Sequence, residues 1–341
     1  MDLKFVPILS LFTKSRKNKI IYSKSKRAES LDVTRKLGQE MNEKSYSKNI
    51  HWYPGHMVKA QRQIEERIKL VDIVYEILDA RIPYSSQNPV IKKIVGQRNR
   101  LVLLNKTDLA DPQVTKMWLD EFEKQGLQAL AIDSLHSSAK EKILAKSKVM
   151  LAEKFEKEKA KGLRPRPIRA MIIGIPNAGK STLINTLAKR KAAQAANKPG
   201  VTKAQQWIKV ATELELLDTP GILWPKFENR HVGFSLALTG AIRDSILPID
   251  DVVIHGINYL LAHYREGFMT RYKLTDEQID IDDSVSVLSA IGENRKFLMA
   301  GGEIDYDRVC ETLIKEIRET KIGRLSFETP KLIEQIEAEN E

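Results

Sequence analysis

A glycine-rich run, residues 174–181, carries the residue types that bind a polyphosphate. Its glycines let the backbone curl so that successive N–H groups point inward, and a helix that starts there adds positive potential. Lys180 would reach the β- and γ-phosphates, and the Ser181 hydroxyl would bind Mg²⁺. The apolar segment 170–173 precedes the run and a helical pattern follows it, as this motif requires. The expected phosphate-binding residues are Asn177, Ala178, Gly179, Lys180, Ser181 and Thr182.

A second motif, Asn105-Lys106-Thr107-Asp108, follows the apolar run 101–104 and has the groups that read guanine. The Asp108 carboxylate can accept hydrogen bonds from guanine N1–H and N2–H₂, whereas adenine offers no such pair of donors. Lys106 would lay its aliphatic stem on the base, and the Asn105 amide would tie this loop to the phosphate loop. Together with the phosphate loop, the motif predicts a guanine nucleotide.

A third motif, Asp218-Thr219-Pro220-Gly221, supplies groups for the γ-phosphate. Asp218 would reach Mg²⁺ through a water, and the Gly221 N–H would contact the phosphate. The glycine also lets the backbone flip when that phosphate leaves. Thr202 is expected to close over Mg²⁺ in the triphosphate state; an ordinary turn at 198–202 is the alternative.

The position that often holds the residue activating the attacking water is occupied here by an apolar side chain. Ile222 follows Gly221, where a water-orienting Gln often stands, and its side chain can do no proton chemistry. His56, two residues after a helix-starting proline and neutral near pH 7, is expected to orient the water. A structural capping role is the alternative for His56, and His51 is a poorer candidate. The expected catalytic residues are His56, Lys180, Thr202 and Gly221.

The order of the motifs is unusual, because the guanine motif precedes the phosphate loop and nothing like it follows residue 221. This order resembles that of the circularly permuted GTPases. Among them, the chain closely resembles the bacterial ribosome biogenesis GTPase A family over about residues 50–327. The resemblance is carried by Trp52-Tyr53-Pro54-Gly55-His56-Met57, Asp79-Ala80-Arg81-Ile82-Pro83, residues 174–181, 217–224 and Leu238-Thr239-Gly240-Ala241-Ile242.

The resemblance implies binding to the immature large (50S) ribosomal subunit and GTP hydrolysis during its late assembly, stimulated by the particle. It implies that the helical C-terminal part contacts rRNA, and that Asp133 and Ser134 complete the guanine side of the site. Asn177 resembles the asparagine by which some GTPases hold K⁺ beside the phosphates, in addition to Mg²⁺. A signalling or membrane-recruited GTPase and a module that uses nucleotide only as a structural ligand are the alternatives.

Apolar runs that alternate with helices predict the sheet that positions these motifs. Continuous apolar strands indicate a mostly parallel sheet covered by helices on both faces, an α/β fold. The expected strands are 73–78, 101–104, 127–132, 170–173, 207–210 and 214–217, and the expected C-terminal helices are 232–243, 250–266, 282–298 and 306–321. We expect a basic extension at 1–48, a circularly permuted GTPase domain at 49–227 and a helical domain at 228–341. The order would join the loop after Gly221 directly to the helical domain, so that loss of the γ-phosphate becomes a rigid-body motion.

Composition points to an anionic partner, since the 341 residues carry a net charge of +11. Residues 1–50 carry seven of these net positive charges, and we expect residues 1–48 to be largely unordered. Three interpretations stay open for them: a basic arm that contacts RNA, a targeting segment, or a start codon assigned too far upstream, with Met41 as the actual start. The single cysteine, Cys310, excludes an intrachain disulfide and is expected to be a core residue. No apolar run is long enough to span a bilayer, so we expect no stable membrane association. We also expect a monomer in the cytoplasm, since a single cysteine fits a reducing compartment.

Overall fold

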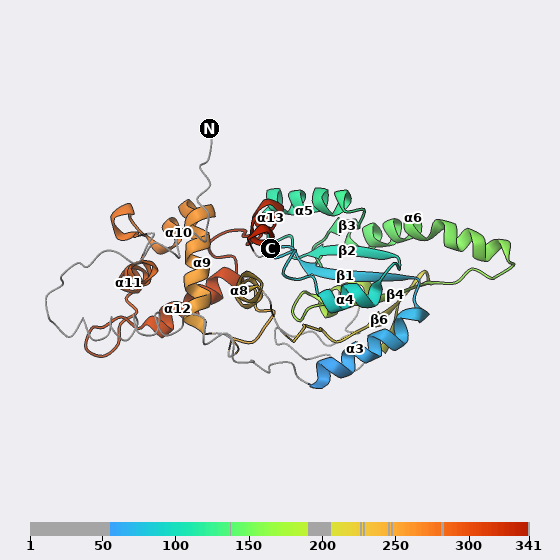
Figure 1. Ribbon diagram of the computed structural model, residues 1–341, viewed down its shortest axis with the longest axis horizontal. Helices are drawn as coiled ribbons and strands as arrows, with labels where there is room; N and C mark the ends of the chain where they lie inside the picture. The colour runs from blue at the N-terminus through green and yellow to red at the C-terminus, as the bar shows by residue number, and fades with distance from the viewer. Residues whose placement is uncertain are drawn as a thin grey trace.

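The computed structural model describes residues 55–136, 138–189, 206–225, 227, 229–244, 246, 248–280 and 283–339. Within them, a six-stranded sheet has the strand order β3-β2-β1-β4-β6-β5. Neighbouring strands are parallel, except that β5 and β6 are antiparallel. The bounds are β1 Ile73–Asp79, β2 Arg100–Asn105, β3 Gln128–Ala131, β4 Ile168–Gly174, β5 Gln206–Ala211 and β6 Leu214–Asp218. The predicted mostly parallel sheet is therefore confirmed (Figure 1).

Helices cover both faces of this sheet, because successive strand residues point to opposite sides. On one face Val74 and Met171 pack with Ile64 of α3, while Val102 packs with α5. On the other face the buried Tyr75 hydroxyl lies 2.8 Å from Ser147 Oγ of α6. The helices of this part are α3 Gly55–Arg67, η1 Ile68–Leu70, α4 Pro89–Val95, α5 Pro112–Lys124, α6 Ser138–Ala160 and α7 Lys180–Ala188.

Helices make up the remainder of the chain, as the sequence predicted, but several bounds differ. The single helix predicted over 250–266 is wrong, because Tyr264 leaves the helical conformation (φ −135°) and separates α9 from α10. The helix predicted over 232–243 ends at Leu238, ahead of Gly240, whose φ of +75° a helix does not contain. The bounds are α8 Arg230–Leu238, α9 Ile249–His263, α10 Arg265–Tyr272, η2 Asp276–Gln278, α11 Ser284–Arg295, α12 Tyr306–Arg318 and α13 Pro330–Ala338.

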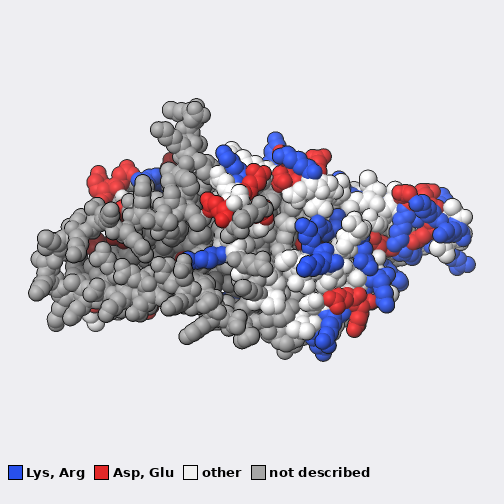
Figure 2. Space-filling model, in the orientation of Figure 1, with Lys and Arg blue, Asp and Glu red and all other residues white. Residues whose placement is uncertain are grey.

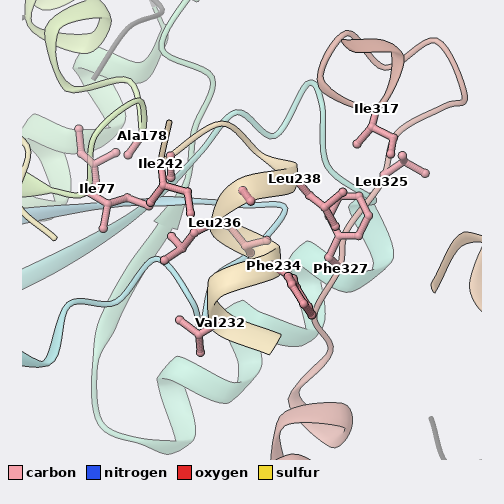
Figure 3. Close-up of a cluster of buried hydrophobic side chains, with 14 of the residues drawn as sticks. Ile77, Ala178, Val232, Phe234, Leu236, Leu238, Ile242, Ile317, Leu325 and Phe327 are labelled. Carbon is pink, nitrogen blue, oxygen red and sulfur yellow. The ribbon is translucent and has the colours of Figure 1, made fainter. Parts of the chain in front are cut away.

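One apolar core runs from the sheet into the helical part through α8. Cys310 is buried in this core, as predicted. In Figure 3, Leu236 of α8 and Ile242, which follows the helix, lie on the side of Ile77, whereas Leu238 and Phe234 of α8 lie on the side of Phe327. Because the same helix contributes to both sides, the sheet and the helical part share buried surface.

The chain returns to the sheet at its end, which the sequence did not predict. Residues 323–329, here called the C-terminal strap, lead from the helical part to α13. Thr329 caps α13 and Pro330 starts it, an arrangement typical of a helix beginning. Ile333 of α13 is buried in the same cluster as Trp118 and Phe122 of α5, and the two helices lie side by side in Figure 1. Among the helices that the structure describes, none combines the length and apolarity that crossing a bilayer requires.

Candidate nucleotide site

The three sequence motifs meet at one edge of the sheet, where its parallel strands end. The guanine loop, residues 105–111, follows β2, and the phosphate loop, residues 174–181, follows β4. The third motif follows β6, and β1 lies between β2 and β4. The carboxyl ends of parallel strands are where α/β sheets hold ligands, so these loops are placed to form one site.

The phosphate loop adopts a backbone that glycine permits at two positions. Gly179 has a φ of +101°, and a Cβ there would lie 2.2 Å from Asn105 Nδ2. Gly174 has a φ of +152°, and a Cβ there would lie 2.4 Å from the Ile77 carbonyl oxygen. Both glycines therefore allow close approach as well as an unusual backbone angle. The loop then opens α7 at Lys180, so Ser181 and the half-buried Thr182 stand in the first turn of that helix.

Lys180 and Asp218 are two buried charges at the centre of the site. Lys180 Nζ donates to the Gly174 carbonyl at 3.1 Å and to the Ile175 carbonyl at 2.6 Å. Burial lowers the pKa of Lys180 to about 8, opposed by the charge of Asp218. Burial raises the pKa of Asp218 to about 6, opposed in turn by Lys180. The site therefore keeps a lysine ammonium beneath the phosphate loop at neutral pH.

The Asp218 carboxylate is suited to a cation that arrives with the nucleotide. Both of its oxygens are buried, and neither has a hydrogen-bond partner among the described residues. Buried carboxylate oxygens are costly unless they are paired, and hydrated Mg²⁺ prefers such ligands. Gly221 follows closely, and a Cβ there would lie 2.8 Å from the Pro176 backbone, so the loop after β6 rests on the phosphate loop.

Asn105 joins three parts of the site through its side-chain amide. Its Nδ2 donates to the Ala178 carbonyl of the phosphate loop at 2.7 Å. Its Oδ1 accepts from the Ser134 backbone N–H at 3.0 Å and from Ser134 Oγ at 2.6 Å. The predicted tie from Asn105 to the phosphate loop is present. The second tie, to Ser134 after β3, was not predicted.

The guanine side of the site contains two carboxylates. Asp108 is exposed, and its pKa is raised by burial of part of the carboxyl group and by the charge of Asp133. Asp133 accepts from the Leu135 N–H at 2.8 Å and lies 3.2 Å from His136 Nε2. Asp133 therefore lies near Asp108, and its own carboxylate is occupied by local partners.

An ion network behind the guanine loop was missed in the sequence. Lys106, in the left-handed conformation (φ +63°), donates from Nζ to Asp79 Oδ2 at 2.9 Å. Arg81 donates to both Asp79 oxygens, at 2.9 and 2.8 Å. Burial opposes ionisation of Asp79, but the charges of Arg81 and Lys106 outweigh it and hold its pKa below the ordinary value. The sequence signal that could have indicated this network is the carboxylate of Asp79 at the end of the buried strand β1. In the structure, Asp79 positions the Lys106 ammonium.

The four remaining expected site residues are Thr202, His51, His56 and Asn177. Thr202 lies in 190–205 and His51 precedes residue 55, so both lie outside the described residues. His56 belongs to the first turn of α3, but its side chain lies outside the described part as well. Asn177 has a φ of +58°, and its Nδ2 donates to the Gly240 carbonyl at 2.7 Å. Asn177 thus connects the phosphate loop to the turn after α8.

Comparisons with known proteins agree with this geometry. Residues 169–290 match the family described as 50S ribosome-binding GTPase; the match begins at β4 and leaves out the guanine loop, as a permuted order requires. The Ribosome biogenesis GTPase A of Priestia megaterium is 54% identical, over 84% of this chain and 99% of the relative. That of Thermotoga maritima is 32% identical, over 85% of this chain and 98% of the relative.

Solved structures give the same result. The GNP-bound structure of YlqF from T. maritima matches with a TM-score of 0.55 and 26% identity, covering 80% of this chain and 99% of that chain. A GDP-bound YlqF structure matches with a TM-score of 0.56, covering 79% of this chain and all of the other. The sequence relatives and the arrangement of the site together show that this chain belongs to the ribosome biogenesis GTPase A family of circularly permuted GTPases.

Proposed function

We propose that the protein binds the immature large (50S) ribosomal subunit and hydrolyses GTP during its late assembly. The observation that carries the proposal is the Asn105 side chain of the guanine loop, which donates to the Ala178 carbonyl of the phosphate loop and accepts from Ser134 Oγ after β3, in a chain of this family. The names of the relatives give no support to a signalling or membrane-recruited GTPase. Because the substrate particle is made there, the cytoplasm is the expected location, and a monomer is the expected form.

GTP would lie across the carboxyl edge of the sheet. Asp108 would accept from guanine N1–H and N2–H₂, and the Lys106 stem would lie against the base while Asp79 holds its ammonium. Residues 177–182 would surround the phosphates with backbone N–H groups. Asp133 and Ser134 would close the guanine side, since Asn105 fixes the Ser134 backbone.

Mg²⁺ fits the donor set that the chain offers. Ser181, Thr202 and Asp218 would hold it, Asp218 with the two buried oxygens that have no partner among the described residues. When bound, the ion would neutralise charge on the β- and γ-phosphates. Lys180 supplies a further positive charge to the same oxygens, and the Gly221 N–H would contact the γ-phosphate.

The attacking water needs a polar group other than Ile222, which is buried in an apolar cluster with Ala60 and Ile64 of α3. His56 is our candidate, because it stands at the start of the same helix. α3 leads through η1 into β1, so its amino end lies toward the edge where the strands end (Figure 1). Thr202 would complete the catalytic set with Lys180 and Gly221.

Potassium binding by Asn177 is a second part of the proposal. The amide nitrogen of Asn177 faces Gly240, so a cation beside the phosphates would be held by the amide oxygen. Such an ion would add positive charge where negative charge develops during hydrolysis. Hydrolysis should then be faster in K⁺ than in Na⁺, and equal rates would exclude this role.

Contacts with rRNA would come from the helical domain, 228–341, and from basic side chains on the sheet part. Lys59, Arg62 and Lys69 are exposed on or just after α3. Figure 2 shows Lys and Arg side chains over α3 and α4 and along α6, mixed with acidic ones. The mixture favours local contacts with phosphates over a continuous nucleic-acid groove.

The testing experiment is GTP turnover by the full chain with and without purified immature 50S particles, in K⁺ and in Na⁺. We expect stimulation by the particle, and the absence of both stimulation and co-sedimentation in the presence of a non-hydrolysable GTP analogue would refute the proposal. His56→Ala should bind nucleotide normally and lose stimulated turnover. A normal stimulated rate would eliminate the role of His56.

A further inference from the structure

Arg324 of the C-terminal strap donates hydrogen bonds to the guanine loop on both sides of Asp108. Its Nη2 donates to the Thr107 carbonyl, and its Nε donates to the Ala110 carbonyl at 3.1 Å. The two carbonyls flank the residue that would read the base. A planar guanidinium donates in fixed directions, so this fork sets the distance between the two carbonyls.

The next two strap residues continue the same contact. Leu325 N–H donates to the Leu109 carbonyl at 3.0 Å, and Ser326 Oγ accepts from the Asp111 N–H at 3.1 Å. Both strap residues are buried. Three consecutive strap residues therefore bond the guanine loop at four backbone groups, from more than 200 positions away in the sequence.

The strap is itself fixed to the sheet part on its other side. Phe327 N–H donates to the Arg81 carbonyl at 2.8 Å, and Trp118 Nε1 donates to the Glu328 carbonyl at 2.9 Å. The buried Glu328 carboxylate accepts from the Tyr84 N–H at 2.7 Å. The strap thus runs from the helical part to a position beside β1 and α5, where these hydrogen bonds hold Phe327 and Glu328.

We propose that Arg324 is a positioning residue for guanine recognition, which it serves by fixing the backbone on either side of Asp108. The proposal rests on the proposed function, in which Asp108 accepts two hydrogen bonds from guanine. The Asp108 side chain is exposed, so packing does not orient its carboxylate. A fixed loop backbone must therefore hold the carboxylate in the orientation that two simultaneous hydrogen bonds to guanine require. Guanine affinity then depends on a residue that follows the helical part in the chain.

The test compares binding of GDP and inosine diphosphate by the full chain. Inosine lacks the 2-amino group, so the ratio of the two affinities reports on the second hydrogen bond to Asp108. Arg324→Ala should weaken GDP binding roughly tenfold, because two charge-assisted hydrogen bonds are lost. It should also lower the ratio of GDP affinity to inosine diphosphate affinity. Turnover at saturating GTP should stay within about twofold of wild type. Arg324→Lys should recover part of the GDP affinity, since an ammonium can still donate to a loop carbonyl.

Arg98→Ala is the matched control. The exposed Arg98 guanidinium also donates to two backbone carbonyls, of Ile94 and Val95, but it lies just before β2, at the opposite edge of the sheet. Its loss should leave both affinities unchanged. If Arg324→Ala does not fold, Arg324→Gln is measured in the same way.

Three results would overturn the proposal in different ways. An unchanged ratio of GDP to inosine diphosphate affinity in the Arg324 variant, with wild type preferring GDP to ADP, overturns the positioning role alone. Equal binding of GDP and ADP by wild type overturns the guanine site and the positioning role together. A loss that Arg98→Ala reproduces also overturns the role of Arg324.

Discussion

Asp72, the residue before β1, joins two strands and a helix at the edge of the sheet opposite the nucleotide site. Its carboxylate accepts from Arg166 Nη1 and Nη2 at 2.7 and 2.8 Å and from Lys154 Nζ of α6 at 2.6 Å. It also accepts from the Arg169 N–H of β4 at 2.9 Å. Replacing it by asparagine removes the charge and turns an amide N–H₂ toward these donors.

The size of the effect follows from the pKa. Burial opposes ionisation of Asp72, but hydrogen bonds from Arg166, Lys154 and the Arg169 backbone lower its pKa from 3.8 to about 2. At about 1.4 kcal/mol for each pKa unit, ionised Asp72 contributes about 2.5 kcal/mol to the free energy of unfolding. Because the folded pKa is the lower one, this contribution is present above about pH 4 and is lost as the pH falls toward 2.

Urea unfolding of Asp72→Asn and wild type between pH 7 and pH 3 tests this reasoning. We expect the variant to be less stable by about 2.5 kcal/mol at pH 7, with the difference shrinking below pH 4. Glu213→Gln is the control: its partner Lys148 lies 2.6 Å away, but both side chains are more than half exposed, so the change should stay below about 0.5 kcal/mol. A pH-independent difference, or none at pH 7, would refute the calculation.

Three further changes test the site and the packing. Gly179→Ala places a Cβ 2.2 Å from Asn105 Nδ2 at a positive φ, so GDP affinity should fall roughly 100-fold; a titration within threefold of wild type would contradict the steric argument. Asp108→Asn should shift preference from guanosine to xanthosine nucleotides, and retained GDP selectivity would show that another group reads the base. Ile333→Ala should lower the free energy of unfolding by about 2 to 4 kcal/mol, because the side chain is buried against Trp118. A loss under 1 kcal/mol in urea would mean that α13 packs loosely.

The sheet and its loops could be predicted because their signals are local. The central strands β1, β2 and β4 are mostly apolar and buried, and a buried parallel strand needs no other mark. Asn105 was predicted to reach the phosphate loop because the motif fixes its position at a strand end. Asp79 also stands at a strand end, but no motif indicates that its carboxylate pairs with the side chains of Arg81 and Lys106.

The strap could not be predicted, because its bonds are long-range and use backbone groups. The Leu325 N–H and the Leu109 carbonyl have no sequence signature, and neither residue type is required for the bond. The interruption at Tyr264 was missed for a similar reason. Its hydroxyl accepts from the Ser326 N–H at 3.0 Å, so a tertiary contact accompanies a break that the apolar pattern does not show.

The end of α8 shows how closely the helical part is tied to the nucleotide site. A helix leaves its last carbonyls without helical partners, and side-chain donors commonly satisfy them. Here Arg81 donates to the carbonyl of the cap residue Thr239 at 3.3 Å, Asn177 donates to the Gly240 carbonyl just beyond the cap at 2.7 Å, and Arg318 of α12 donates to the Ala237 carbonyl at 2.7 Å. The first donor also binds Asp79 behind the guanine loop, the second belongs to the phosphate loop, and the third belongs to the helical part. The loop after Gly221 is therefore one of several connections, and any displacement of α8 relative to the sheet must break bonds made by residues of the site itself.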